Sequence, residues 1–151
     1  MSTMTDKGPL GLYYEEFEEG VKMVTRGRTI TEADIVNFAG LTGDYNPMHV
    51  DAEYAKNSFM GERVAHGMLV ISYAVGQAYQ LGILDQTTLA FRALDVKFSM
   101  PVVIGDTIRV ELEVTGKKDA SRLGGGMVDL KFRVLNQDDK AVQKGTMTML
   151  M

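Results

Sequence analysis

The stretch GMLVISYAVGQAYQL, residues 67–81, decides the fold of this chain. Wound as a helix, it places apolar or small side chains on most of its sides: Met68, Leu69, Ile71, Ser72, Tyr73, Ala74, Val75, Ala78 and Tyr79. A helix that is apolar nearly all round must be buried. Small residues such as Ser72 and Gly76 would let a sheet approach closely, although Gly76 costs about 1 kcal/mol of helix propensity. The stretch therefore predicts a central buried helix.

After this helix, apolar residues recur at every second position, which is typical of half-buried strands. The first run places Leu94, Val96, Phe98 and Met100 on one face, and further runs cover 108–114, 128–134 and 142–150. Consecutive strands of this kind predict an antiparallel meander. The fold class expected is α+β, with one antiparallel sheet wrapped around the central buried helix. Such a sheet leaves an open edge or face, so we expect a homodimer or a higher homo-oligomer.

The segments before the helix are shorter. Residues 1–20 are predicted to be an N-terminal arm and residues 21–151 a single domain. Thr31, with Asp34 three residues later, resembles a capping box, which predicts a helix that ends between Gly40 and Gly43. Asp51 is expected to cap a brief helix over 51–59.

Composition excludes several classes of protein. The chain has 151 residues, 45% hydrophobic and 24% charged, which suits one globular domain. Its formal net charge is -4 and its basic residues are scattered, which argues against a nucleic-acid partner. No apolar run of about 18 residues is present to cross a membrane. Without cysteine there is no disulfide or thiolate chemistry, and we expect a cytoplasmic protein.

Residues 41–50, LTGDYNPMHV, are the best candidates for chemistry. His49 is one of only two histidines, and an imidazole can accept and return a proton near neutral pH. A nearby carboxylate can orient it or share the work, so Asp44 and His49 form a candidate catalytic dyad. Asp44 and Asn46 also suit an Asx turn, with Pro47 fixing the backbone. The two interpretations are compatible.

The second histidine, His66, precedes Gly67 at the expected start of the buried helix. Glycine there would let a backbone N–H approach a ligand, whereas the position of His66 suits capping or packing better than direct catalysis. Asp44, His49 and His66 could also bind zinc or iron, but their spacing gives that idea no special support.

Three segments resemble one known family in the same order. They are TGDYNPMHVDAEYA (42–55), VAHGML (64–69) and FRALDVKFSMPVVIGD (91–106). They are similar to segments of the MaoC-like, (R)-specific enoyl-CoA hydratases, and the resemblance covers roughly residues 20–150. It implies a hot-dog fold and syn addition of water to a trans-2-enoyl-CoA, giving an (R)-3-hydroxyacyl-CoA. It also implies a homodimer with pockets near the subunit interface, an acyl-CoA substrate of fatty acid metabolism, and no metal or other cofactor.

The resemblance assigns roles to matching residues. Asp44 and His49 match the catalytic pair, Asn46 matches the motif asparagine, and the Gly67 N–H matches the contact to the thioester oxygen. Lys56, Arg63, Arg92 and Lys97 are candidates for the phosphates of coenzyme A, although any one of them suits a solvated surface as well. A hot-dog acyl-CoA thioesterase and a non-catalytic acyl-binding module are the alternatives. The sequence leaves acyl length, reaction direction and pathway open.

Overall fold

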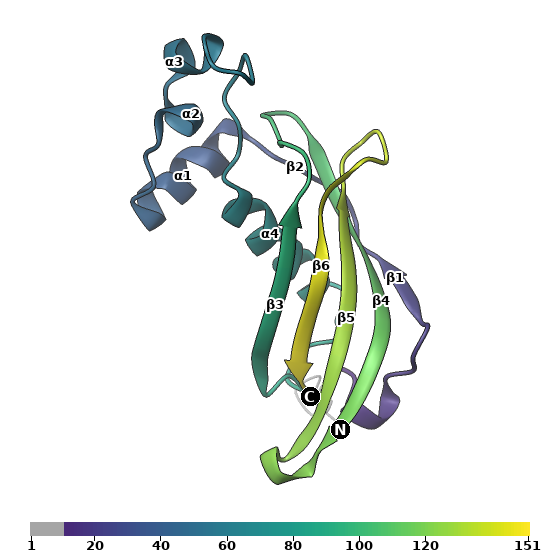
Figure 1. The fold of residues 1–151 in the computed structure, drawn as a ribbon. Helices are drawn as coiled ribbons and strands as arrows, with labels where there is room; N and C mark the ends of the chain where they lie inside the picture. The colour runs from purple at the N-terminus through teal and green to yellow at the C-terminus, as the bar shows by residue number, and fades with distance from the viewer. Residues whose placement is uncertain (1–10) are drawn as a thin grey trace, which may run out of the picture.

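The computed structural model describes residues 11–151 (Figure 1). Its elements in chain order are η2 (Tyr14–Glu16), β1 (Lys22–Val24), β2 (Arg28–Thr29), α1 (Glu32–Thr42), α2 (Pro47–Val50), α3 (Ala52–Lys56), α4 (Gly67–Tyr79), β3 (Ala90–Phe98), β4 (Thr107–Ala120), η3 (Ser121–Leu123), β5 (Gly125–Leu135) and β6 (Ala141–Leu150). No helix among these residues is long and apolar enough to cross a membrane.

The strands form one antiparallel sheet in the order β1-β4-β5-β6-β3, and β2 also pairs with β4. The predicted meander is therefore only partly right. β4, β5 and β6 follow one another, but β3 pairs with β6, with Leu94 opposite Met147. The reason is that β1 and β2 occupy the free edge of β4, so the connection after β3 carries the chain to the other side of the sheet.

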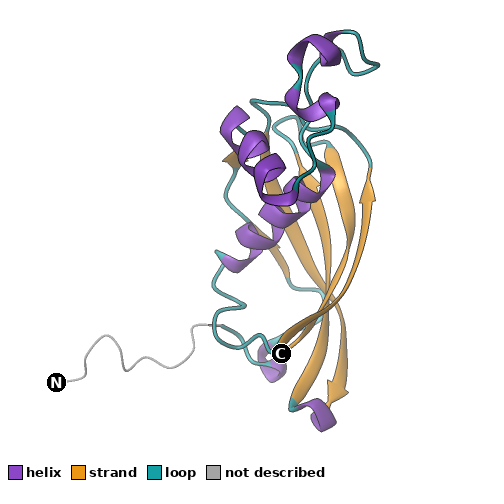
Figure 2. Ribbon diagram, turned by 90° about the vertical axis from the view of Figure 1, so that its left-hand side faces the viewer, coloured by secondary structure: helices purple, strands orange, loops and turns teal. Residues whose placement is uncertain are grey.

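Helix α4 packs on one face of the curved sheet (Figures 1 and 2). The core between them contains Leu69, Ile71 and Ala74 of α4 and, from the sheet, Ile108, Val110, Leu112, Leu130 and Phe132. This arrangement confirms the predicted α+β class with a sheet around a helix.

The prediction that this helix is buried on nearly all sides is wrong for the single chain. Met68 is 54% exposed and Tyr79 is 53% exposed, and Ser72 and Gly76 lie exposed between them. The sheet covers only one side of the helix, so the opposite stripe faces outward.

Strand β3 also departs from the prediction of a half-buried strand. Of its inward-predicted residues, Val96 packs against the core, whereas Leu94 is 40% exposed and Phe98 is 56% exposed. As the last strand of the sheet, β3 has no neighbour on its outer side among residues 11–151. This apolar edge is open in one subunit.

The predicted capping box at Thr31 is confirmed. The Asp34 amide donates to Thr31 Oγ1 at 3.2 Å, and the Thr31 amide donates to Asp34 Oδ2 at 2.9 Å. Tyr73 of α4 donates its hydroxyl to Asp34 Oδ1 at 3.0 Å, and Arg28 pairs with the same carboxylate. Burial raises the pKa of Asp34, but the hydrogen bonds from Thr31 and Tyr73 and the charge of Arg28 outweigh it, so the pKa lies below its usual value. The carboxylate thereby joins α1 to α4.

The other local predictions also correspond to observed features. Helix α1 ends as expected, at Gly43 in the left-handed conformation (φ 81°). Asp51 caps α3 by accepting from the Tyr54 amide at 2.9 Å, but this helix stops at Lys56 rather than Phe59. The Ser58 hydroxyl donates to the carbonyl of Ala55 at 2.7 Å, which replaces a helical continuation with a turn.

Residues 1–10 of the predicted arm lie outside the described residues. From Gly11 onward the chain packs on the domain: the Leu12 amide donates to the Ile83 carbonyl at 2.9 Å, and Phe17 is 2% exposed within the core. The boundary placed at residue 20 stays a prediction.

Candidate active site

Local hydrogen bonds shape the 43–50 segment that carries the predicted dyad. Asp44 Oδ1 accepts from the Asn46 amide at 3.2 Å, and Asn46 Oδ1 accepts from the Met48 amide at 3.3 Å. Asn46 is thus the N-cap of α2, and Pro47 takes its first position, where no amide hydrogen is needed. The expected Asx turn is present. It leaves Asp44 exposed and places His49 within the protein, 7% exposed.

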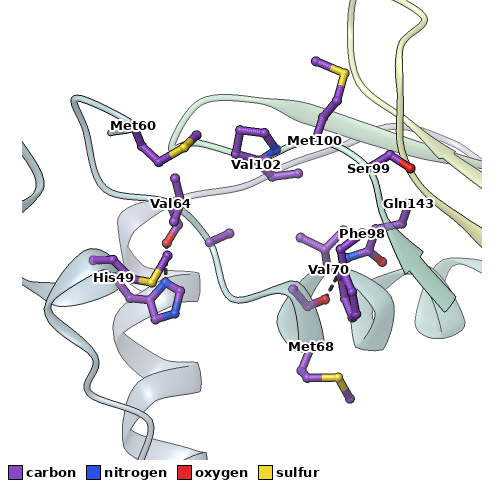
Figure 3. A pocket seen from close by; sticks show the side chains of 14 residues that line it. His49, Met60, Val64, Met68, Val70, Phe98, Ser99, Met100, Val102 and Gln143 are labelled. Atoms are coloured by element: carbon purple, nitrogen blue, oxygen red, sulfur yellow. Dashed lines mark hydrogen bonds between the residues drawn. The ribbon is translucent and has the colours of Figure 1, made fainter. Parts of the chain in front are cut away.

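The backbone of a distant segment holds His49. Its Nδ1 lies 2.7 Å from the Val64 carbonyl oxygen (Figure 3). A carbonyl can only accept, so Nδ1 carries the hydrogen, and in the neutral ring Nε2 has the lone pair. Arg63 Nε donates to the His49 carbonyl at 2.8 Å and its guanidinium pairs with Glu32. The ring is therefore fixed in the tautomer of a general base.

The structure brings Asp44, His49 and His66 together. One carboxylate oxygen and one nitrogen from each ring lie within 4.8 Å of one another. Within residues 11–151, no direct hydrogen bond joins the Asp44 carboxylate to the His49 ring. A water bound to both groups needs two contacts of about 2.8 Å, so two polar atoms up to 4.8 Å apart can share one. Two imidazoles and a carboxylate also form a donor set that zinc or iron(II) uses, so the absence of a metal stays a prediction.

His66 packs rather than caps. It precedes α4, but its side chain makes no capping hydrogen bond. Its Nε2 donates to the main-chain oxygen of Asp44 at 2.9 Å, and its ring stacks on that of His49 with centroids 3.8 Å apart. His66 therefore contacts both members of the dyad, through the backbone of one and the ring of the other.

Gly67 is the first residue of α4, so its amide has no acceptor within the helix. A Cβ at this position would come within 2.6 Å of the Phe98 ring. Only glycine lets the ring lie this close to the helix start. The free amide and the positive end of a 13-residue helix meet here.

A pocket of about 480 Å³ lies beside these groups. Figure 3 shows its lining residues: Met48, His49, Met60, Val64, Ala65, Gly67, Met68, Val70, Phe98, Ser99, Met100, Pro101, Val102 and Gln143. Most of these side chains are apolar, and several are methionines, which adapt to ligands of different shape. His49 and Gly67 line the pocket. Asp44 and His66 do not, so His49 is the dyad member that faces this space.

The four cations considered for coenzyme A phosphates do not line this pocket. Lys56 pairs with Glu53, and Arg63 is engaged with Glu32 and the His49 carbonyl. Arg92 and Lys97 lie on the exposed edge strand β3. Sequence reasoning did not single out Phe98 or Gln143 as residues of the site. A signal for Gln143 was present, because by alternation it shares a face of the last strand with Met147 and Met149.

Residues 16–132 match the model of the MaoC like domain family. The chain belongs to the MaoC-like family. This MaoC-like chain is 43% identical over 105 residues to Protein MaoC of Klebsiella aerogenes. The aligned residues make up 69% of this chain and 31% of that relative. It is 38% identical over 107 residues to the (R)-specific enoyl-CoA hydratase of Rhodospirillum rubrum, covering 69% of the chain and 70% of that enzyme. The chain thus spans about a third of the first relative and most of the second.

Solved structures agree with this assignment. R-Hydratase PhaJ1 from Pseudomonas aeruginosa has a TM-score of 0.79 and 34% identity, covering 93% of this chain and 85% of that one. A Mycobacterium tuberculosis protein with a double hot-dog fold has a TM-score of 0.82 at 19% identity, and the match covers 94% of this chain and 44% of that one. The second comparison concerns the fold alone. The expected hot-dog fold and the MaoC-like resemblance are confirmed, and two of these relatives are named as hydratases.

Proposed function

We propose that this protein is an (R)-specific enoyl-CoA hydratase. It would catalyse the reversible syn hydration of a trans-2-enoyl-CoA to an (R)-3-hydroxyacyl-CoA without a metal or other cofactor. The observation that carries this proposal is the approach of Asp44 and His49 to within 4.8 Å of each other, with His49 and Gly67, the first residue of α4, lining one pocket. The names of the relatives support the substrate class, since the Rhodospirillum protein is called an (R)-specific enoyl-CoA hydratase.

Hydration of a conjugated thioester requires proton transfers on both sides of one water molecule. The Nε2 lone pair of His49 and the Asp44 carboxylate can together bind the water and remove a proton as its oxygen attacks C3. Electrons then move to the thioester oxygen, and a proton returns to C2 from the same pair. Because both groups would contact one water, we assign each transferred proton to the pair rather than to one side chain.

The negative charge that develops on the thioester oxygen needs a donor. The Gly67 amide can supply one, aided by the roughly +0.5 charge at the helix N-terminus. One such donor contributes about 10² to 10³-fold to the rate in enzymes where it has been removed. His49 and the Gly67 amide lie at the same pocket, so one bound thioester could reach both.

The acyl chain would occupy the methionine-lined pocket. Its volume of about 480 Å³ lies within the usual range for small-molecule sites, roughly 300 to 1,000 Å³. The lining is mainly apolar, as a fatty acyl group requires.

We further propose that the protein is a homodimer formed through β3. This strand has nine residues, an unpaired edge and exposed apolar side chains, whereas β1 at the opposite edge has three residues. Leu94→Arg should therefore give monomers, measured as mass by light scattering. Val24→Arg, at the β1 edge, introduces the same charge and should leave the dimer intact. Dimer loss in the second variant but not the first would place the interface elsewhere.

The activity test uses crotonyl-CoA with two readouts. Loss of the conjugated absorbance without release of free thiol, with (R)-3-hydroxybutyryl-CoA as product, is the result expected. Thiol release without that change would instead indicate a hot-dog thioesterase. Binding without either reaction would indicate a non-catalytic acyl-binding module.

A further inference from the structure

Gln143 on β6 is buried at the candidate active site, and its side-chain oxygen has no hydrogen-bond donor within the described residues. It is 2% exposed and lies among the residues that line the pocket. Its Nε2 donates to the Gly67 carbonyl at 2.8 Å, across 76 positions of sequence. Its Oε1 is buried and has no hydrogen-bond partner within the described residues. Figure 3 shows the side chain beside Phe98 and Val70, with this hydrogen bond drawn.

The contact with Gly67 decides how the amide of Gln143 is oriented. A carbonyl oxygen can only accept, so the nitrogen of Gln143 faces it and Oε1 points away. A buried acceptor without a partner is unfavourable, and a ligand that brings a donor removes that penalty. Because Oε1 itself is buried, a ligand reaches it only if a neighbouring side chain shifts. The Phe98 ring lies beside Gln143 in Figure 3 and is 56% exposed in the single chain.

We propose that Gln143 Oε1 accepts a hydrogen bond from the thiol arm of the substrate, at the amide N–H closest to the sulfur. Gln143 is then a specificity-determining residue for pantetheine-type thioesters. This inference rests on the proposed function, because it places the thioester carbonyl at the Gly67 amide.

The placement of the carbonyl leaves one donor for Gln143. A 3-hydroxyacyl thioester carries a hydroxyl on the acyl side of its carbonyl and an amide N–H on the sulfur side. The hydroxyl oxygen derives from the water between Asp44 and His49. Gln143 is bonded to the residue that would hold the carbonyl, so the amide on the sulfur side is the donor that remains for it.

The test compares two small substrates that differ in that donor alone. They are the crotonyl thioesters of N-acetylcysteamine and of 2-mercaptoethyl acetate, in which an ester oxygen replaces the amide N–H. In the wild-type protein, kcat/KM should be about tenfold higher for the amide, as expected for one hydrogen bond to a buried acceptor. In Gln143→Met, which keeps the shape of the side chain without its amide, the ratio should fall to about one.

Gln77 on α4 provides a matched control. It is 5% exposed and has a buried Oε1 without a partner, and its Nε2 donates to two backbone carbonyls, but it does not line the pocket. Gln77→Met should therefore keep the wild-type ratio. A ratio of about one in the wild-type protein would overturn the inference without any variant, as would an unchanged ratio in Gln143→Met.

Binding of the two saturated butyryl thioesters, measured by calorimetry, separates this inference from the proposed function. Suppose that the amide thioester binds more tightly, that this preference disappears in Gln143→Met, and that no crotonyl thioester is hydrated. This result would support the proposed role of Gln143 and reject the proposed hydratase activity. Hydration with equal binding of both thioesters would reject the proposed role of Gln143 and leave the proposed hydratase activity in place.

Discussion

Replacing Asp44 by Asn, or His49 by Gln, is expected to lower kcat/KM for crotonyl-CoA hydration by about 10² or more. Each change keeps the approximate size of the side chain and removes its ability to take a proton from water. In Asp44→Asn, the new side-chain oxygen would still accept from the Asn46 amide, so the turn that shapes this segment should survive. Steady-state kinetics measures the effect, and circular dichroism and light scattering check that the fold and mass are unchanged.

Asp51→Asn is the matched control for the carboxylate. Asp51 makes the same kind of contact, to the Tyr54 amide, in the adjacent segment, but it caps α3 away from the pocket. Asparagine is an equally good N-cap, so stability and activity should both stay close to those of the wild-type protein. If Asp44→Asn and His49→Gln both retained wild-type activity, the dyad would have no catalytic role.

The largest effect on stability is expected for Gly145→Ala in β6. A Cβ at Gly145 would overlap the Asp95 carbonyl oxygen of β3 and lie 3.1 Å from the Phe132 ring of β5. Backbone cannot yield as a flexible side chain can, so the pairing of β3 with β6 must shift. We expect a loss of about 3 kcal/mol or more in the free energy of unfolding, at the upper end of overpacking effects.

Denaturant unfolding measures this loss, and Gly40→Ala is its control. Gly40 lies exposed in α1, and a Cβ there meets only the Tyr45 hydroxyl, at the ordinary distance of 3.5 Å. The same substitution should therefore be neutral or stabilising by up to about 1 kcal/mol, through helix propensity. Equal unfolding midpoints for Gly145→Ala and the wild-type protein would show that β3 and β6 can separate locally at no cost.

Much of the candidate site was predictable because its geometry is local. The turn at Asp44 and Asn46, the left-handed Gly43 and the placement of Pro47 all depend on hydrogen bonds that span a few residues. The contacts of His66 were less predictable. It stacks on His49 and bonds to Asp44 from 22 positions away, and nothing in the sequence sets the direction of its ring.

The amino-acid sequence by itself determined the α+β class, the helix start at Thr31, the turn that carries Asp44 and His49, and the glycine at the start of α4. Each depends on periodicity or on short-range hydrogen bonds. Only the tertiary structure decided that β3 pairs with β6, that Val64 sets the tautomer of His49, and that Gln143 bonds to Gly67. An alternating pattern shows which side of a strand is apolar. Because every strand has the same pattern, it does not show which strands pair. Which strands become neighbours depends on edges already occupied, and contacts between distant segments follow from that choice.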